Sequence, residues 1–461
     1  MSEGRTHFVG VGGCGMSALA QFHVLGGKAA SGSDRLLDRG GIAVLRRQFE
    51  ALGIRLFPQD ASGVDRSVSE LVVSTAIEDT IADLARAREL GIPVLHRTDV
   101  LARHVREHKT LAVAGTSGKS TVTAMVFEIL EAAGQGPSII TGAPLNSLKK
   151  KGFIGSGFQG KSDLLVIEAD ESDGTLPKYA PWLGLLLNVS KDHKELADLH
   201  RIFQDFRARS GRFVVLADAA GLEAYQEGAV TYGFERGQVR GRDLETSGRG
   251  SRFTVEGVRF ELPLPGRYNA ENALAAAAAC REAGVPLATA AEALSRYQGI
   301  ERRFELVGRA GDVEVIDDYA HNPEKVRAVL EGAHARIAGR PRSRVLALYQ
   351  LHGFTPTRFL KNEFITAFSR ALHPEDVLWL PPIYYVGGTA VKDIAAAHIA
   401  QPVRASGKDA RAPESREAAA EELAREARPG DIVLVLGARD PTLSDCARGI
   451  FERLQARWPA A

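Results

Sequence analysis

The chain has 461 residues, of which 44% are apolar and 25% are charged, and its formal net charge is +1. This length and composition indicate a globular protein of about three domains. Because the charge is balanced and no segment is dense in lysine or arginine, the composition argues against a nucleic-acid or anionic-membrane partner.

Cysteine usage and hydropathy indicate a protein of a reducing compartment. Cys14, Cys280 and Cys446 are odd in number and far apart, which excludes a disulfide framework and the paired spacing of a zinc site. No basic-then-apolar leader and no apolar stretch of ~20 residues is found, so neither a secretion signal nor a membrane helix is predicted. We expect a cytoplasmic protein that is a monomer or a homodimer.

Residues 6–100 alternate short apolar runs with helical patterns. The runs THFVGVGG, ELVVSTAI and IPVLH read as strands, and GMSALAQFHVLG, with a helix from Met16, and DTIADLARARELG read as helices. This alternation predicts a doubly wound α/β domain with parallel strands.

The first predicted strand ends in a glycine-rich turn. Gly10, Gly12 and Gly15 match G-x-G-x-x-G, and Asp34 follows at about the distance of a Rossmann acidic residue. These residues alone predict a dinucleotide. A glycine turn into a helix N-terminus holds any phosphate-bearing ligand, and a tight turn without a ligand is the simplest alternative.

A phosphate-binding loop opens the second block. GTSGKST at 115–121 follows the strand TLAVAG and precedes the helical VTAMVFEILEAAG. Val113 stands where a Walker loop has its first glycine, so we predict a shorter loop with Val113 inside the strand. Gly115 and Gly118 let the backbone surround phosphate oxygens, Lys119 supplies a cation to the β- and γ-phosphates, and Ser120 offers a hydroxyl to Mg²⁺.

Carboxylates end two further predicted strands of this block. IEADESD spans 167–173 and NVSKDH spans 188–193. Acids this close repel one another unless a cation neutralises them, and Mg²⁺ prefers carboxylate oxygens with substrate phosphates. We therefore predict a Mg²⁺ site beside the phosphate loop. Taken alone, His193 is a weak candidate, since a lone histidine is usually structural. The alanine-rich ENALAAAAACREAG, later in the block, predicts a helix.

The third block contains four buried strands with polar C-terminal ends. They are VEVIDDYAHNP, RVLALYQLHG, EDVLWLPPIY and IVLVLGARD. Ligands bind at such strand ends in open α/β sheets. Since the basic GIERRFE and VIDDYAHNP lie in or beside this block, we expect two domains to grip the nucleotide, as suits a ligase or kinase that excludes water.

Taken together, these motifs resemble the Mur ligase family, which makes peptidoglycan precursors. HFVGVGGCGMSALA, AVAGTSGKST, EADESD, DH, PGRYNAENALAA, RRF and DDYAHNP occur in family order over nearly the whole chain. The first and third are most similar to the alanine-adding branch, with the muropeptide-recycling branch as a near relative. The resemblance implies three α/β domains: a Rossmann-like one at 1–106 for a UDP-sugar, a P-loop ATPase-like one with a parallel sheet at 107–298, and a Rossmann-like one at 299–461 for the acceptor.

The resemblance also implies the reaction. ATP would phosphorylate the carboxylate of UDP-N-acetylmuramate or a close analogue, and an amino acid or other amine would attack the acyl phosphate and leave an amide. An acid outside cell-wall synthesis, or muropeptide recycling, stays as the alternative. ATP and Mg²⁺ are the implied cofactors.

Site residues follow motif by motif. The catalytic set is Lys119, Glu168, His193 and Arg302, in which Glu168 with Ser120 would bind Mg²⁺ and His193 a second ion. The ATP set is Gly115, Thr116, Ser117, Gly118, Lys119, Ser120, Thr121, Asn269, Asn272, Arg302 and Asp317. The UDP-sugar set is Gly12, Gly13, Gly15, Met16, Ser17, Asp34, Ser74, Thr75 and Ala76. The acceptor set is Tyr319, His321, His352 and Arg358.

The chain departs from the family pattern in three places. Ser117 and Ser120 stand in a loop that commonly reads G-T-H-G-K-T-T, and the segment after His193 is shorter. Where the alanine-adding branch reads Q-P-H-R-Y-T-R-T-R, this chain reads QLHGFTPTR, so Gly353 and Pro356 replace two arginines. Arginine is the residue that best clamps a carboxylate bidentately. The acceptor is therefore open between a different amine and an amino acid held by Arg358.

Overall fold

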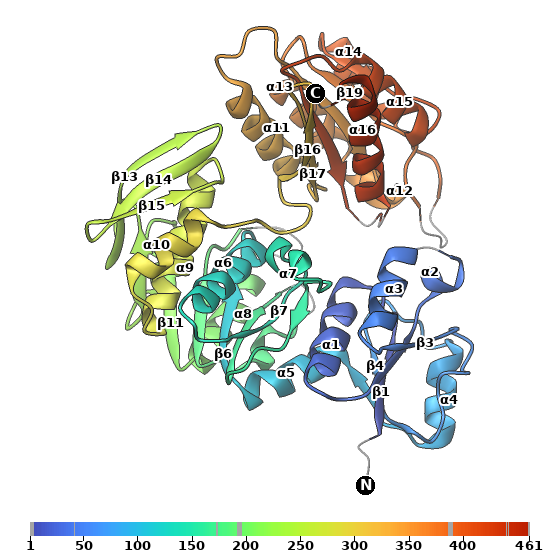
Figure 1. Cartoon of the computed structure of the whole chain (residues 1–461), viewed down its shortest axis with the longest axis vertical. Helices are drawn as coiled ribbons and strands as arrows, with labels where there is room; N and C mark the ends of the chain where they lie inside the picture. Colours follow the sequence, from blue (N-terminus) through green and yellow to red (C-terminus); the bar gives the residue numbers. More distant parts are fainter. Residues whose placement is uncertain are drawn as a thin grey trace. The chain divides into compact units, whose positions relative to one another are not determined.

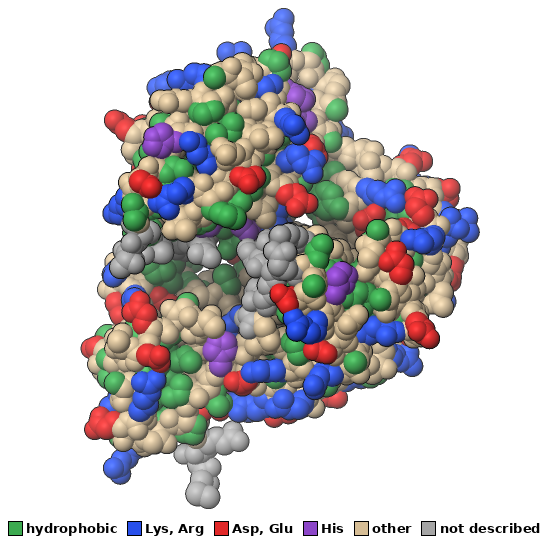
Figure 2. All heavy atoms as spheres, turned by 180° about the vertical axis from the view of Figure 1, so that it is seen from behind, with side chains coloured by type: hydrophobic (Ala, Val, Ile, Leu, Met, Phe, Trp, Pro, Cys, Tyr) green, Lys and Arg blue, Asp and Glu red, His purple; other side chains and the backbone are tan. Residues whose placement is uncertain are grey.

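The computed structural model describes residues 4–40, 42–171, 174–190, 196–385, 391–438, 440 and 442–459 (Figure 1). The chain folds into two compact units, Met1–Thr246 with Gly250–Ile300, and Ser247–Arg249 with Glu301–Ala461. No helix in the described ranges is long and apolar enough to cross a membrane. On the face drawn in Figure 2, acidic and basic side chains are interspersed.

The first sheet has five parallel strands in the order β3-β2-β1-β4-β5, which is a Rossmann order. The predicted Rossmann-like domain is confirmed. Its strands are β1 (Arg5–Val9), β2 (Ala30–Ser33), β3 (Arg55–Phe57), β4 (Val68–Val73) and β5 (Val94–His96). Its helices are α1 (Cys14–Leu25), α2 (Arg35–Asp38), α3 (Ala43–Ala51), α4 (Ala82–Leu90) and α5 (Arg97–Glu107).

The first helix begins earlier than predicted. It starts at Cys14 and not at Met16, with Gly13 as its N-cap in an extended conformation. Of the four glycines in this turn, Gly10 has a positive φ, of 76°. The chain therefore completes its reversal at Gly10 and reaches helical geometry by Cys14.

The central sheet has ten strands in the order β15-β14-β13-β12-β11-β10-β6-β9-β7-β8. Parallel pairs run from β13 through β7, and β14 and β15 form an antiparallel pair. The strands are β6 (Lys109–Ala114), β7 (Ser138–Ile140), β8 (Gly157–Phe158), β9 (Leu164–Glu168), β10 (Leu183–Leu186), β11 (Arg212–Leu216), β12 (Val230–Gly233), β13 (Val239–Ser247), β14 (Gly250–Val255) and β15 (Val258–Leu262).

Helices of the central region are α6 (Lys119–Ala132), α7 (Asn146–Lys150), α8 (Leu196–Arg209), α9 (Arg267–Glu282) and α10 (Leu287–Ser295), with the 3₁₀ turns η1 (Leu176–Lys178) and η2 (Glu223–Tyr225). The alanine-rich helix is α9, and its residues 273–280 are buried. Small side chains allow α9 to pack closely against α6, the helix that follows the phosphate loop.

A close contact joins the first and central sheets within one unit. Helix α1 packs on β8, where a Cβ added to Gly157 would lie 2.1 Å from the carbonyl oxygen of Ala18. Gln21 of α1 also donates to Ser156 Oγ at 2.8 Å. Only glycine permits this backbone approach, so the core is continuous from α1 into the central sheet.

The third sheet has six strands in the order β16-β17-β21-β18-β19-β20, with β16 antiparallel. They are β16 (Glu305–Ala310), β17 (Val313–Asp318), β18 (Val345–Gln350), β19 (Val377–Trp379), β20 (Asp409–Arg411) and β21 (Ile432–Gly437). The helices are α11 (Pro323–Ile337), α12 (Phe354–Phe359), α13 (Lys361–Ala371), α14 (Ala397–Ala405), α15 (Arg416–Glu426) and α16 (Leu443–Arg457).

Helices cover both faces of this third sheet, as the prediction of an α/β domain required. Along β21, Ile432, Leu434 and Leu436 pack with α11, α13 and α14, whereas Val433 and Val435 pack with α15 and α16. Because successive side chains of a strand point to opposite faces, an unbroken apolar run such as IVLVLG can serve two cores. The four predicted strands of this block are confirmed as β17, β18, β19 and β21. The domain boundaries at 106 and 298 remain proposals.

Candidate active site

The phosphate loop joins β6 to α6. Val113 lies inside β6, as predicted, and Lys119, Ser120 and Thr121 form the first turn of α6. Gly115 and Gly118 have φ angles of 140° and 85°, which side chains rarely allow. The backbone N–H groups at the start of α6 and the helix dipole therefore face the loop, which suits an anion.

Asn188, at the end of β10, holds the loop from the neighbouring strand. Its Oδ1 accepts from Thr116 Oγ1 at 2.8 Å and from Ser117 N at 2.9 Å, and its Nδ2 donates to Ser117 O at 3.0 Å. Thr116 Oγ1 also contacts Ser190 Oγ at 2.8 Å. Asn188 was not among the predicted site residues, although it lies just after a strand that pairs with β6.

Lys119 is partly buried and makes two short contacts. Its Nζ donates to Gly115 O at 2.7 Å and to Glu171 Oε2 at 2.8 Å, and Asp170 Oδ1 lies 3.9 Å away. Burial alone lowers the pKa of Lys119, but the carboxylates of Asp170 and Glu171 outweigh it and raise the pKa above the ordinary value. Lys119 is thus a fixed cation at the mouth of the loop, and Glu171, which the sequence analysis did not single out, is its partner.

Glu168 accepts three hydrogen bonds beside Lys119. Oε1 accepts from Ser120 Oγ at 2.9 Å, and Oε2 accepts from Thr141 Oγ1 at 3.1 Å and Gly142 N at 2.9 Å. Strand β9 pairs with β6 so that Glu168 lies opposite Val113, which places the carboxylate at the loop. The predicted metal pair, Ser120 and Glu168, is therefore in contact. Its hydroxyl and carboxylate oxygens are ligands that suit Mg²⁺. His193, the third predicted ligand, lies outside the described residues.

Helix α9 contributes two asparagines that lie differently. Asn272 lies against the loop, since a Cβ added to Gly118 would be 2.7 Å from its Oδ1. Asn269 is buried, and its Nδ2 donates to Pro265 O at 2.7 Å. The structure thus brings Asn272 to the phosphate loop and uses the Asn269 amide to hold the turn before α9.

If the loop binds ATP as the sequence predicts, replacing Gly118 by alanine is expected to weaken that binding by about tenfold or more, because the new Cβ displaces Asn272 and distorts the loop. Gly134, at the other end of α6, is the matched control: its φ is 71° and nothing lies within 4 Å of an added Cβ. Both alanine variants carry backbone strain of about 1–2 kcal/mol. Calorimetric titration with ATP should show a loss of affinity in Gly118→Ala but not in Gly134→Ala. An equal loss of affinity in both variants would show that backbone strain, and not the clash with Asn272, weakens binding.

Arg302 and Asp317 form an ion pair in the third sheet's unit. Arg302 Nε donates to Asp317 Oδ1 at 3.1 Å and Nη2 donates to Gly437 O at 2.6 Å. Ser444 Oγ donates to Asp317 Oδ2 at 2.6 Å, so both carboxylate oxygens are engaged. Arg302 has a φ of 56°, a conformation that costs a non-glycine residue energy and often marks a functional position.

Three of the four predicted acceptor residues form an aromatic group. The ring centroids of Tyr319 and His321 are 5.5 Å apart, and those of His321 and His352 are 6.3 Å apart. Burial, with Lys325 nearby, lowers the pKa of His321 to about 4, so its ring is neutral at physiological pH. Arg358, the fourth predicted acceptor residue, is not part of this aromatic group. Its Nε donates to Asp393 Oδ1 and its Nη2 donates to Val391 O, each at 2.9 Å.

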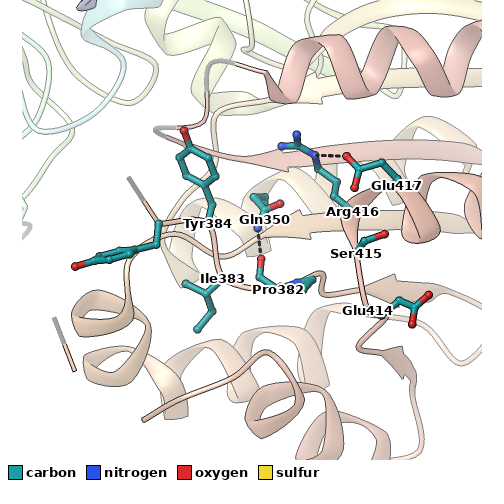
Figure 3. Close-up of a pocket in the computed structure, with 9 residues that line it drawn as sticks. Gln350, Pro382, Ile383, Tyr384, Glu414, Ser415, Arg416 and Glu417 are labelled. Carbon is teal, nitrogen blue, oxygen red and sulfur yellow. Dashed lines mark hydrogen bonds and ion pairs between the residues drawn. The ribbon is translucent and has the colours of Figure 1, made fainter. Parts of the chain in front are cut away.

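An open hollow of about 320 Å³ lies beyond the carboxyl end of β18 (Figure 3). Its lining includes Gln350, Tyr384, Glu414, Arg416 and Glu417. Arg416 donates to Asp440 and, through Nη2, to Thr442 Oγ1 at 2.9 Å. Arg416 was not among the predicted site residues, although it begins a helix that follows a parallel strand, where open α/β sheets bind ligands.

The first sheet carries the predicted UDP-sugar residues. Asp34 Oδ2 accepts from Gly12 N at 3.0 Å while Oδ1 caps α2 through Leu36 N at 2.8 Å. Met16 and Ser17 are buried, so their side chains face the core. A Cβ on Gly15 would lie 2.6 Å from Arg97 Nη1, which places this unassigned arginine at the turn. Residues 74–76 form a turn after β4, where Ile77 N donates to Ser74 O.

Comparison with known proteins agrees with this architecture. Three family models match in order: the Mur ligase family catalytic domain at residues 5–109, the Mur ligase middle domain at 113–280, and the Mur ligase glutamate ligase domain at 302–439. The chain is similar to the UDP-N-acetylmuramate–L-alanine ligase of Sorangium cellulosum, at 35% identity over 100% of this chain and 99% of that protein. The enzyme of the same name from Streptomyces coelicolor is 35% identical, over 95% of each chain.

Solved structures of two ligases have a similar fold over nearly the whole chain. The UDP-N-acetylmuramate-alanine ligase of Thermotoga maritima superposes with a TM-score of 0.81 at 25% identity, covering 98% of this chain and 100% of that one. A murein peptide ligase of Psychrobacter arcticus shares the fold, with a TM-score of 0.68 at 22% identity and 98% coverage of each chain. The ordered family models and the full-length likeness establish that the chain belongs to the Mur ligase family.

Proposed function

We propose that the protein is an ATP- and Mg²⁺-dependent ligase of cytoplasmic peptidoglycan precursor synthesis, joining an amino acid to the carboxylate of UDP-N-acetylmuramate or a close analogue. The observation that carries the proposal is the phosphate loop, where Lys119 is held beside the Ser120–Glu168 pair. The similarity to UDP-N-acetylmuramate–L-alanine ligases over 95–100% of the chain supports this donor and makes L-alanine the first acceptor to test.

The proposed reaction has two balanced steps. A carboxylate oxygen of the sugar acid attacks the γ-phosphorus of ATP and ADP leaves, which gives an acyl phosphate. The acceptor amine then attacks the acyl carbon, inorganic phosphate leaves, and the nitrogen loses a proton. Both steps require that water be excluded, because water would hydrolyse the acyl phosphate.

Lys119 carries the first step in this proposal. Its ammonium, held by Glu171, would lie where negative charge accumulates on the β- and γ-phosphates, and such preorganised charge stabilises a transition state. Ser120 and Glu168 would hold Mg²⁺, and His193 a second ion; the metal would neutralise the transferred phosphoryl group. Asn272 would contact the nucleotide, Arg302 its phosphates and Asp317 the ribose.

The predicted acceptor-binding residues favour a second candidate function, in which the same ligase reaction uses an amine other than L-alanine. Gly353 takes a φ of 67° and its N–H donates to Tyr384 O at 2.8 Å, so the position of a family arginine is a glycine turn. Arg358 is paired with Asp393 and is not among the residues that line the hollow. Arg416 is also paired, with Asp440 and Thr442, but it does line the hollow beyond the carboxyl end of β18. We propose that Arg416 takes the place of the missing arginines for an acceptor that bears a carboxylate.

The test is phosphate release from Mg-ATP with UDP-N-acetylmuramate across L- and D-amino acids and the tripeptide L-alanyl-γ-D-glutamyl-meso-diaminopimelate, with mass spectrometry of the product. One strong amide product is expected. Arg416→Lys keeps a positive charge beside buried Asp440 and is expected to raise KM for the acceptor while KM for ATP stays unchanged. No phosphate release with any amine would refute the donor assignment, and an unchanged acceptor KM would refute the role of Arg416.

A further inference from the structure

A group of metal-ligand side chains lies at the end of α5, in the segment HVREH. His104, Glu107 and His108 each offer one ligand atom, and these three atoms lie within 4.8 Å of one another. His104 and His108 are four residues apart, so they meet on one side of the helix end. His108 is the single residue between α5 and β6, the strand that leads into the phosphate loop.

His104 is buried without a hydrogen-bond partner for either ring nitrogen. Its Nδ1 lies 3.7 Å from Glu107 Oε2, and the ring packs edge-on against Phe22 of α1 at a centroid distance of 4.9 Å. Two ligand atoms bound to one tetrahedral Zn²⁺ are about 3.3–3.5 Å apart, given bond lengths of ~2.0–2.2 Å. A small closure of this pair would therefore place both atoms on one ion.

The hydrogen bond of His108 fixes its tautomer. Its Nδ1 lies 2.9 Å from His104 O, and since a carbonyl oxygen only accepts, Nδ1 must carry the proton. The lone pair of the neutral ring is then on Nε2. Histidines that bind metals regularly donate the other N–H to a backbone carbonyl in this way, which fixes the tautomer and the ring.

The two basic side chains near the group are either paired or exposed to solvent, which limits their repulsion of a bound cation. Arg103 is the neighbouring arginine, and it is paired bidentately with Glu70 at 3.0 and 2.9 Å. Lys28, which also faces His104, is exposed to solvent. Glu107 brings a negative charge that a bound ion would neutralise.

We propose that His104, Glu107 and His108 bind a divalent transition-metal ion of the Zn²⁺ class, with water completing the coordination. Imidazole with carboxylate favours Zn²⁺, Co²⁺ or Ni²⁺ over Mg²⁺, so this site is chemically distinct from the Ser120–Glu168 pair. The ion has a structural role: it ties the last turn of α5 to the residue that begins β6. The inference is independent of the proposed function.

A second group of possible metal ligands, formed by His334, His373 and Asp376, is unsuited to an ion because its members already bind one another. Asp376 already accepts from His334 Nε2 at 2.7 Å, from Val345 N at 2.7 Å and from His373 N at 2.6 Å. The two imidazole rings are stacked at 3.7 Å with an interplanar angle of 12°, and stacked rings cannot aim in-plane lone pairs at one ion. This group is satisfied internally, so His373→Gln is a matched control for the proposed site.

The test is titration of the full-length protein with Co²⁺, read by visible d–d absorption, and with Zn²⁺, read by the thermal unfolding midpoint. We expect one equivalent to bind and raise the midpoint. His108→Gln, at a partly exposed position, and Glu107→Gln, at an exposed one, should each weaken binding at least tenfold. Both are preferable to replacing buried His104. Glu168→Gln and His373→Gln should bind normally.

Two results would overturn the proposal. One is the absence of any one-equivalent Co²⁺ signal in the unmodified protein. The other is a signal that persists in His108→Gln and Glu107→Gln but disappears in Glu168→Gln or His373→Gln, which would assign the ion to the phosphate loop or to the stacked histidines.

Discussion

Replacing Lys119 by methionine is expected to lower kcat for ATP-dependent amide formation by at least about 10²–10³-fold, the loss typical of removing one preorganised charge from a transition state. Methionine keeps most of the side-chain volume but has no ammonium to place on the phosphates. The measurement is the initial rate of phosphate release at saturating ATP. Lys150→Met, at an exposed lysine of α7, is the control and should retain full activity.

Folding must be separated from chemistry in this experiment. Without Lys119, the carboxylate of Glu171, which is 5% exposed, loses its ion-pair partner, and an unpaired buried charge costs about 3–5 kcal/mol. The double variant Lys119→Met with Glu171→Gln removes that charge. We expect the double variant to have a higher free energy of unfolding than Lys119→Met, close to that of the unmodified protein, and to remain as inactive as Lys119→Met. Recovery of activity in the double variant would show that Lys119 acts only as a structural partner of Glu171.

Glu168→Gln is expected to raise the Mg²⁺ concentration needed for half-maximal activity by at least about 10–100-fold. The amide keeps one oxygen for the Thr141 and Gly142 donors, so the local structure survives, but the negative charge beside Ser120 is gone. A neutral amide is a poor ligand for a hard cation. The experiment is a series of initial rates of phosphate release against Mg²⁺ at fixed ATP.

The matched control is Glu131→Gln, at the other end of α6, where the carboxylate pairs with exposed Lys151 at 3.3 Å. Its Mg²⁺ dependence should be unchanged. If Glu168→Gln also shows the unmodified half-saturating Mg²⁺ concentration while kcat falls, then Glu168 positions Ser120 and does not bind the metal.

Local features were predictable because their causes are local. The strand–loop–helix order around GTSGKST correctly predicted Val113 inside β6 and a helix after the loop, but α6 begins at Lys119, within the motif, and not at Val122 after it. The unbroken apolar runs of the third block predicted buried parallel strands, and these are found. The start of α1 was predicted two residues late, because glycine patterns do not reveal which residue takes the positive φ.

The sequence by itself determined the family, the three α/β regions and the residues of the phosphate loop, since these follow from motif order and from hydrophobic periodicity. Only the tertiary structure decided which side chains contact the predicted site residues. Glu171 meets Lys119, and Asn188 meets the loop, because β9 and β10 flank β6 in the sheet. It also decided that Arg358 pairs with Asp393 while Arg416 lines the hollow. Strand order and the pairing of polar side chains arise from contacts between distant segments, and no local pattern encodes them.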